Sequence, residues 1–225
     1  MSMNKIYTVG HSIQSIEEFY EMIYKYGIDC VIDVRSMPFS QHAPQFNKDL
    51  LKLFLNRYNI IYAHFGTEFG ARRTDCLVPT IKDGVYVKQV NFEKGVFTDD
   101  FQRGIRRLNM ALSQGRTISL MCTESNPLDC HRFSFISRYL FDNKYDVAHI
   151  TRDKLTKEIV ARSHEYFENC MIKEYLSKKN HVLREIGTNL FGESYSKEEQ
   201  RNDAYKLKNR DIGFIPTQPK EDMFN

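Results

Sequence analysis

Residues 29–34 read DCVIDV, a short run that is apolar at almost every position. A continuous apolar run of this length is typical of a strand that is buried on both faces of a parallel sheet. Residues 15–26, just before it, carry apolar side chains at helical spacing. Ser15 and Glu18 form the capping-box pattern at the start of that segment, and Gly27 stands where helices commonly end. These residues therefore predict a helix that leads into a buried strand.

The same alternation extends in both directions from this stretch. Strands are predicted over residues 5–9, 29–34, 60–64, 117–122 and 147–150, and helices over residues 15–26, 47–57, 99–113 and 129–143. Residues 65–97 contain several Gly and no sustained period, so we expect a long, partly ordered loop there. Alternating strands and helices imply βαβ units with right-handed crossovers. The predicted fold is therefore α/β: a three-layer arrangement with a mainly parallel sheet of about five strands and helices on both faces.

The composition changes after residue 150. Residues 151–225 are rich in Lys, Arg, Glu and Asn, with helical stretches near residues 154–179 and 197–208 and an extended end. We therefore expect two parts. Residues 1–150 form an α/β domain that carries the candidate site, and residues 151–225 form a charged helical extension with an extended tail.

The overall composition is that of a globular protein, with 225 residues, 41% hydrophobic and 27% charged. No apolar run approaches the roughly 20 residues that a membrane helix needs. Strand character begins at Lys5, which leaves no room for a signal peptide, so we expect a cytoplasmic protein without a membrane segment. The five Cys are an odd number, and reduced thiols are expected rather than a disulfide framework. The net charge of +3 neither requires nor excludes a nucleic-acid partner.

Polar side chains gather where the predicted strands end. The carboxyl ends of parallel strands meet at one edge of a sheet, and ligands of open α/β sheets bind at that edge. We therefore expect these residues to form one site. They are His11, Ser12, Asp33, Arg35, Ser36, His64, Arg72, Arg73, Cys122, Glu124, Cys130, His131 and Arg132.

Two of these residues are thiols that suit three different chemistries. Cys122 ends a predicted strand, and a thiolate beside a helix start and basic side chains is stabilised. Cys122 would be a nucleophile with His11 or His131 as its base. Alternatively, Cys122, Cys130 and His131 would hold a zinc or iron ion, although seven residues between the two Cys are not a standard zinc spacing. The two Cys would otherwise form a transient disulfide, or Cys122 would be a small buried apolar residue.

The remaining polar residues have candidate roles around the thiols. Glu124 and Asp33 are candidate acids or bases, although the simplest role for Asp33 is to hold Arg35 in place. Guanidinium groups match phosphate and carboxylate, so the Arg residues predict an anionic substrate. The catalytic candidates are Cys122, His11, His131, Glu124 and Asp33, and the substrate-binding candidates are Arg35, Ser12, Ser36, Arg72, Arg132, His64 and Asn47.

Five blocks of sequence, TVGHS, IDVRSMPFS, PQFN, YAHFGTEFGARR and MCTESNPLDCHR, occur in this order over about residues 5–150. Their order and the long last block resemble the domain-of-unknown-function family 488. Residues 66–70 depart from the pattern, since such proteins tend to show a tighter Leu-Gly-Gly. The resemblance implies an α/β fold and an enzyme-like site, and it supplies no activity. It carries over to Gly10, His11, Ser12, Asp33, Arg35, Ser36, Pro38, Gln45, Phe46, Asn47, His64, Gly70, Cys122, Glu124, Pro127, Cys130, His131 and Arg132.

The part of the chain after residue 150 adds two possible partners. Basic side chains are interleaved with Tyr175, Tyr195 and Tyr205, which would suit nucleic acid. Interspersed acidic residues make a solvated helical face the preferred interpretation. Met223 and Phe224 resemble the apolar end of peptides that dock on the bacterial sliding clamp, but the leading Gln is missing, which favours an extended terminus.

Three functional hypotheses follow from these observations. The leading one is an enzyme of unassigned reaction class that acts through a Cys thiolate on an anionic substrate, such as a nucleotide, a nucleic acid or another phosphorylated compound. The second is a metal-binding protein that uses Cys122, Cys130 and His131. The third is a non-catalytic accessory protein associated with nucleic acid.

Overall fold

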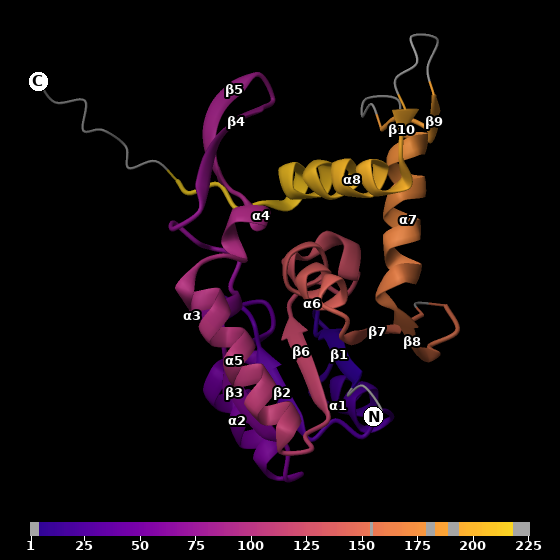
Figure 1. Ribbon diagram of the computed structural model, residues 1–225. Helices are drawn as coiled ribbons and strands as arrows, with labels where there is room; N and C mark the ends of the chain where they lie inside the picture. Colours follow the sequence, from indigo (N-terminus) through magenta and orange to yellow (C-terminus); the bar gives the residue numbers. More distant parts are fainter. Residues whose placement is uncertain (1–4, 154, 179–182, 189–193, 218–225) are drawn as a thin grey trace, which may run out of the picture.

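The computed structural model describes residues 5–153, 155–178, 183–188 and 194–217. It is a mixed α/β structure built on a mostly parallel six-stranded sheet with the strand order β3-β2-β6-β1-β7-β8 (Figure 1). The strands are β1 (Lys5–Gly10), β2 (Cys30–Asp33), β3 (Ile61–His64), β6 (Ile118–Cys122), β7 (Asp146–Arg152) and β8 (Ile159–Ser163). The five predicted strands are the five parallel ones, and β8 adds an antiparallel strand at the edge beside β7.

The register brings the carboxyl ends of the central strands together. Gly10 at the end of β1 is paired with Cys122 at the end of β6. Asp33 at the end of β2 is paired with His64 of β3 and Met121 of β6. The polar residues that follow these strands therefore start from one edge of the sheet, as the sequence predicts.

Helices bury their apolar faces against the sheet in two separate clusters. One contains Phe19 of α1 (Ile16–Tyr24) and Leu51 of α2 (Lys48–Asn56), packed with Val31 of β2. The other contains Leu108 of α5 (Asp99–Ser113) and Leu140 of α6 (Arg138–Asp142), packed with inward side chains of β1, β2 and β6. Successive side chains of β2 point to opposite faces of the sheet, so they belong alternately to one cluster and to the other.

The sequence predicts the N-terminal caps of two helices, and the structure confirms one of them in full and the other only in its position. Ser15 caps α1 with a complete capping box with Glu18. Asn47 precedes α2 as predicted, but its side chain makes no cap hydrogen bond; its Oδ1 accepts from the backbone N–H of Ser40 instead. A short helical turn (η1, Pro44–Phe46) leads into α2.

The loop predicted over residues 65–97 is wrong. This segment forms α3 (Gly66–Phe69), the hairpin β4 (Leu77–Lys82) and β5 (Val85–Val90), and α4 (Phe92–Gly95). The hairpin projects from the body of the structure in Figure 1. Its turn is Asp83-Gly84, with φ of 51° and 78°. Two positive φ angles match the two-residue turn that the Asp-Gly dipeptide favours between strands.

The helix predicted over residues 129–143 is present in three pieces. A 3₁₀ turn (η2, Pro127–Asp129) is followed by a π-helical segment (η3, Arg132–Ser137) and then by α6. All six residues of η3 are buried. A π-helical segment shifts the side chains that follow it around the helix, and such segments are frequent at functional sites.

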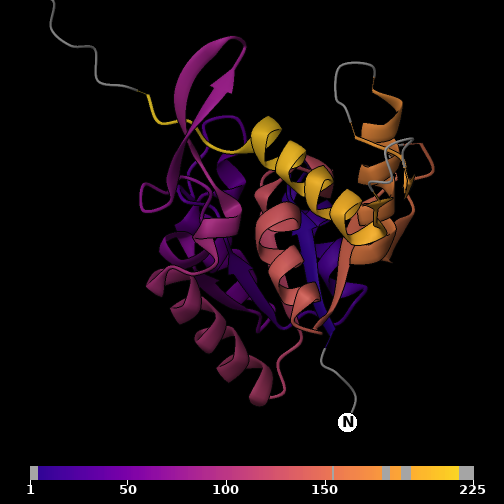
Figure 2. The same cartoon turned by 45° about the horizontal axis from the view of Figure 1, so that its top comes forward.

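The C-terminal part joins the sheet and then covers one end of the structure. A helix predicted from residue 154 is wrong over β8, and the helix α7 begins at His164 and ends at Ser177. Two short strands, β9 (Gly187–Thr188) and β10 (Ser194–Tyr195), precede α8 (Lys197–Ile212), which confirms the second predicted helix. Helix α8 crosses over α6 in both views (Figures 1 and 2). A third apolar cluster joins α7, α8 and η3 through residues such as Phe133, Met171 and Tyr205.

Within these described ranges, no helix combines the length and the apolar character needed to cross a membrane. The predicted sliding-clamp contacts, Met223 and Phe224, lie outside the described residues.

Candidate functional site

Three metal-ligating side chains meet at the carboxyl end of β6. Cys122 is the last residue of β6, and Cys130 and His131 follow the connecting loop just before η3. All three are buried, and one donor atom of each lies within 4.8 Å of the others. The Nδ1 atom of His131 is 3.8 Å from the Sγ atom of Cys122 and 3.8 Å from that of Cys130. The structure therefore brings together the three residues that the sequence singled out as candidate ligands.

Backbone contacts orient this cluster. The Nε2 atom of His131 lies 3.3 Å from the carbonyl oxygen of Val34, an acceptor, so Nε2–H donates there and Nδ1 faces the two sulfur atoms. The backbone N–H of Arg132 donates to the Sγ atom of Cys130 at 3.5 Å. A His ligand whose other nitrogen is held by a carbonyl is the usual arrangement at metal centres.

The two thiols differ in their proton affinity. A hydrogen bond to Cys130, together with burial, raises the pKa of Cys122. Burial alone would raise the pKa of Cys130 too, but the hydrogen bond from Cys122 and the charges of Arg132 and His131 outweigh it and hold that pKa well below its usual value. The hydrogen bond and the two neighbouring cations therefore favour a thiolate at Cys130.

Glu124 and His131 respond to that charge. Burial and the neighbouring Cys130 raise the pKa of Glu124. Burial opposes a charge on His131, but Cys130 outweighs it and raises the pKa of the imidazole. The carboxylate of Glu124 reaches the buried cluster, with Oε2 3.4 Å from the Sγ atom of Cys122, although the residue as a whole is exposed.

A second polar cluster forms around Arg35. Its guanidinium donates to both carboxylate oxygens of Asp33, at 2.9 and 2.6 Å, and to the carbonyl oxygen of Phe46 at 2.7 Å. Tyr62 donates to the same Asp33 carboxylate at 2.8 Å. Holding Arg35 in place is the simplest role that the sequence suggests for Asp33, and the contacts agree with it. Most of the hydrogen-bond donors of the guanidinium are therefore used by protein groups.

His11 belongs to this second cluster. Its Nδ1 lies 2.8 Å from the carbonyl oxygen of Ser12 and therefore carries the proton, while its Nε2 accepts from Arg35 at 3.0 Å. The ring stacks on Phe46 with centroids 4.2 Å apart. Burial, and then the charge of Arg35, lowers the pKa of His11 to about 4. Both nitrogens are occupied, so His11 in this arrangement orients Arg35 rather than accepting a proton from Cys122.

The two clusters are joined through the loops that follow β1 and β6. The backbone N–H groups of His11 and Ser12 donate to the carbonyl oxygens of Cys122 and Thr123, at 3.0 and 2.7 Å. The loops approach so closely that a Cβ at Gly10 would lie 1.8 Å from the carbonyl oxygen of Glu124. Glycine is required there because no side chain fits between the loops.

Arg132, predicted to bind substrate, holds the second of these loops instead. Its guanidinium is fully buried and donates to the carbonyl oxygens of Glu124 and Ser125, at 2.6 and 3.2 Å, and to Thr8 Oγ1 at 3.3 Å. Five N–H donors in a fixed plane suit this kind of multiple contact. Arg132 therefore positions the backbone that carries Glu124.

The other predicted substrate-binding residues lie around the rim. His64 Nε2 contacts the carbonyl oxygen of Arg35 at 2.8 Å, and Ser36 Oγ accepts from the backbone N–H of Arg72 at 2.9 Å. Arg73 is buried and paired with Asp75. Among the described residues, Arg72 is the one of the four Arg predicted to bind an anion that remains exposed. Ser12 lines a cavity of about 460 Å³ beside the loop after β6, whereas Asn47 contacts Ser40.

Sequence reasoning missed Thr8 and His149. Thr8 and His149 are polar residues among the apolar buried residues of their strands, and both are fully buried. A buried polar side chain needs a hydrogen-bond partner, and that requirement is the signal that could have found them. Their register pairs them directly across β1 and β7, and Thr8 Oγ1 lies 2.8 Å from His149 Nδ1.

The aromatic side chains of the C-terminal part are core residues. Tyr175, Tyr195 and Tyr205 are all buried. Lys178 and Lys208 lie over the ring of Tyr175, within 4.8 and 5.4 Å of its centroid. These rings are therefore not available to stack on nucleic-acid bases.

Comparison with known proteins gives one match. The family model described as "Domain of unknown function DUF488" matches residues 15–140, which is more than half of the 225 residues. No curated protein and no solved structure matches the chain. The matched residues run from the start of α1 into α6, so they include the thiol cluster but not β7, β8, α7 or α8.

Proposed function

Because the chain belongs to the DUF488 family, whose description names no reaction, we propose a function from the site itself. Cys122, Cys130 and His131 bind a transition-metal ion, zinc or iron, and this centre is the reactive part of an enzyme. Two soft thiolates and one imidazole are ligands that both metals accept. The enzyme acts at the carboxyl edge of the sheet, where open α/β sheets bind their ligands.

The observation that carries the proposal is the position of His131. Its Nδ1 is equally distant, at 3.8 Å, from two sulfur atoms, while its Nε2 is held by Val34. Metal–sulfur bonds of about 2.3 Å and metal–nitrogen bonds of about 2.0–2.1 Å in tetrahedral geometry place neighbouring donor atoms roughly 3.6 Å apart. A single ion therefore fits between the three donors with little movement.

Three protein ligands leave one position of a tetrahedral centre open. A metal in such a site supplies polarisation of a substrate oxygen or a bound water of lowered pKa. Glu124 lies beside the cluster, with Oε2 3.4 Å from the Sγ atom of Cys122, and the residue is exposed. It is placed to accept or donate a proton, which is the role predicted for it from the sequence.

An anionic substrate remains part of the proposal, with different residues. Arg35 and Arg132 donate to protein groups, so they shape the site. Exposed Arg72 and the cavity lined by Ser12, Arg152 and Lys157 offer cationic and hydroxyl groups near the same edge. These groups suit phosphate or carboxylate.

A second candidate is a nucleophilic thiolate without a metal. It is favoured by the N–H of Arg132, which donates to Cys130 Sγ and stabilises negative charge there. The nucleophile would then be Cys130 rather than Cys122, with His131 as its partner.

Titration with Co²⁺ tests the proposal, because Co²⁺ replaces zinc and its thiolate complexes absorb light. The full chain, reduced and stripped with a chelator, is titrated and its absorption is recorded. We expect one ion per chain with a sulfur-to-cobalt band that zinc removes. Cys130→Ser should lose the band, and Cys170→Ser, which changes a half-buried thiol on α7, should retain it.

Two results would contradict the metal centre: no thiolate band in the wild type, or a band that survives Cys130→Ser. In that case the pH dependence of Cys130 alkylation decides the second candidate. A midpoint well below the free-thiol value of about 8.5 supports the nucleophile, and a midpoint at or above it excludes it.

A further inference from the structure

A row of buried polar side chains runs from the candidate site into the C-terminal helices. Arg132 Nε donates to Thr8 Oγ1, which lies 2.8 Å from His149 Nδ1. His149 Nε2 lies 3.1 Å from His164 Nδ1. His164 Nε2 lies 2.8 Å from the hydroxyl of Tyr205. We call Thr8, His149, His164 and Tyr205 the histidine relay. None of the four residues has more than 1% of its surface exposed.

The far end of the relay fixes the direction of every hydrogen bond in it. The hydroxyl of Tyr205 donates to Glu168 Oε1 at 2.8 Å, because a carboxylate only accepts. The Tyr205 oxygen therefore accepts from Nε2–H of His164, whose bare Nδ1 accepts from Nε2–H of His149.

The same reasoning continues to the site. The bare Nδ1 of His149 accepts from the hydroxyl of Thr8, and the Thr8 oxygen accepts from Nε–H of Arg132. All bonds of the relay thus point one way, from a cation at Arg132 to an anion at Glu168. Aligned bonds of this kind strengthen one another.

Both imidazoles are neutral, as this scheme requires. Burial, followed by the charges of Arg201 and Arg138, lowers the pKa of His164 to about 3. Burial, with smaller contributions from His164 and Arg132, lowers the pKa of His149 well below its usual value. Each ring therefore holds its proton on Nε2 over the physiological pH range.

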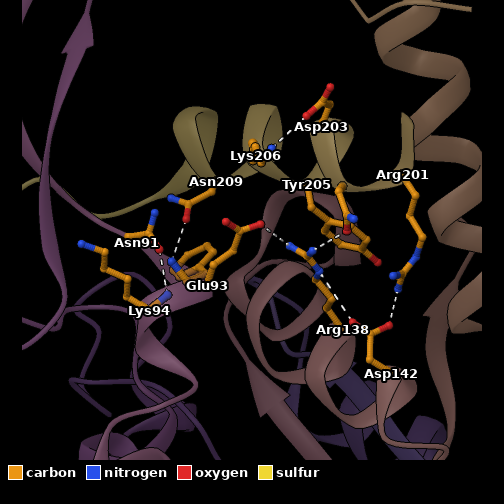
Figure 3. Close-up of polar contacts among 12 residues, drawn as sticks. Asn91, Glu93, Lys94, Arg138, Asp142, Arg201, Asp203, Tyr205, Lys206 and Asn209 are labelled. Carbon is orange, nitrogen blue, oxygen red and sulfur yellow. Dashed lines mark hydrogen bonds and ion pairs between the residues drawn. The ribbon is translucent and has the colours of Figure 1, made fainter. Parts of the chain in front are cut away.

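The anionic end is anchored by charges from α6 and α8. Arg201 of α8 donates to Glu168 Oε1 at 2.7 Å and also pairs with Asp142 of α6. The ring of Tyr205 lies between the guanidinium groups of Arg138 and Arg201, 4.3 and 5.3 Å from its centroid (Figure 3). Helices α6, α7 and α8 therefore hold Tyr205 and Glu168 in one place.

We infer that the histidine relay positions Arg132, and through it the loop that carries Glu124, so that α7 and α8 determine the geometry of the thiol cluster. Arg132 supports this loop by donating to the carbonyl oxygens of Glu124 and Ser125. This inference rests on the proposed function, because the first measurement that tests it is metal binding. Its positioning residues His149, His164 and Tyr205 all lie beyond residue 140, where the family match ends.

The test compares two buried tyrosines in the full chain. Tyr205→Phe removes the hydroxyl that ends the relay. Tyr175→Phe removes another buried hydroxyl, which donates to Asp211 outside the relay. Both should lose comparable stability, so a purely structural role predicts equal behaviour in the native protein. We expect Tyr205→Phe to weaken Co²⁺ binding about tenfold and to shift the cobalt absorption, as loss of outer-shell support does, and Tyr175→Phe to match the wild type.

A second variant and a second readout complete the test. Thr8→Val breaks the relay at its other end and should weaken Co²⁺ binding as Tyr205→Phe does. Its control is Ser119→Ala, which removes a buried hydroxyl of β6 that has no hydrogen-bond partner among the described residues. The control should bind Co²⁺ like the wild type. Proton–nitrogen NMR should show His149 and His164 as Nε2–H tautomers in the wild type. An Nδ1–H tautomer at either, or cobalt binding unchanged in both relay variants, overturns the inference.

Failure of the proposed function has a different signature. If the wild-type protein binds no Co²⁺, the metal centre is wrong and the relay is judged by the rate of Cys130 alkylation. A rate changed at least threefold by Tyr205→Phe but not by Tyr175→Phe supports the positioning role, and equal rates overturn it.

Discussion

Arg35 contacts both carboxylate oxygens of Asp33, through Nε at 2.9 Å and through Nη2 at 2.6 Å, and both side chains are buried. Only one residue, Val34, separates them in the chain. The alternation of side chains along β2 places Asp33 on the same face as Val31, which is the face covered by α1 and α2. Tyr62 and His11 complete the surroundings of this pair. Breaking it leaves a buried charge without its counter-charge.

We predict a large loss of stability for Asp33→Asn. Removing one partner of a buried ion pair leaves the other desolvated, and this costs about 3–5 kcal/mol in free energy of unfolding. Urea denaturation measures the difference. The control is Asp146→Asn, which breaks the exposed pair with Lys5 and should change stability by less than about 1 kcal/mol. Equal effects of the two substitutions would contradict the assignment.

Gly10→Ala should disturb both the fold and the candidate centre. The added Cβ would overlap the carbonyl oxygen of Glu124, so the loops after β1 and β6 must separate, at a cost of about 1–3 kcal/mol. Gly27→Ala is the control, because its Cβ meets open space and its φ of 62° imposes only backbone strain. Both variants should lose stability, but only Gly10→Ala should weaken Co²⁺ binding. Unchanged cobalt affinity in Gly10→Ala would show that the contact does not support the cluster.

Stability should fall below about pH 6.5 because of the buried histidines. The pKa of His164 is about 3 in the folded protein, against about 6.5 in an unfolded chain. Between these values the unfolded state binds more protons, so the free energy of unfolding decreases as pH falls, by up to about 1.4 kcal/mol per pH unit for each such His. Denaturation at pH 7 and pH 5 measures the slope.

His164→Gln provides the comparison for this pH dependence. It removes one of the titrating groups, so it should be less stable than the wild type at pH 7 and should lose less between pH 7 and pH 5. A slope equal to that of the wild type would mean that His164 does not remain neutral in the fold.

Ser15→Ala tests a local contribution. The Ser15 side chain accepts from the backbone N–H of Glu18, and the Glu18 side chain accepts from that of Ser15. Loss of such a cap costs about 0.5–2 kcal/mol. The control is Ser113→Ala, at the exposed C-terminal end of α5. Its free energy of unfolding should stay within about 0.5 kcal/mol of the wild-type value. Thermal unfolding of the two variants separates these outcomes.

The sequence predicts the parallel strands because burial on both faces produces continuous apolar runs. Residues 29–34 and 117–122 are of this kind, and their strands lie inside the sheet. The hairpin of β4 and β5 was missed because its strands lie outside that sheet and carry mixed side chains. Its local signal was the dipeptide Asp83-Gly84.

The edge strand β8 was missed for a related reason. Residues 159–163 read IVARS, are only partly buried and stand in a charged segment. A strand at an edge with one solvated side has a weaker apolar pattern. Helical propensity of the flanking residues then dominated the prediction.

The residues that gather at the candidate site could be predicted from the sequence, but the contacts between their side chains could not. Strand ends identify Cys122, Asp33 and His11, since every parallel strand delivers its last residue to the same edge. Which side chain meets which depends on the strand register and on the path of the loops. Thr8 and His149 became partners only through the pairing of β1 with β7, which residue spacing does not reveal.

The antiparallel strand β8 has a consequence for how the protein behaves in solution. It covers β7, whose Val147, Ala148 and Ile150 are buried, along the full set of pairs from Ala148–Ser163 to Arg152–Ile159. A chain cut after residue 152 would leave β7 as an uncovered edge strand, able to pair with the same edge of another molecule. The last third of the chain therefore closes a sheet edge that would otherwise offer unpaired backbone groups to a second molecule, and a shortened form should aggregate more readily than the whole chain.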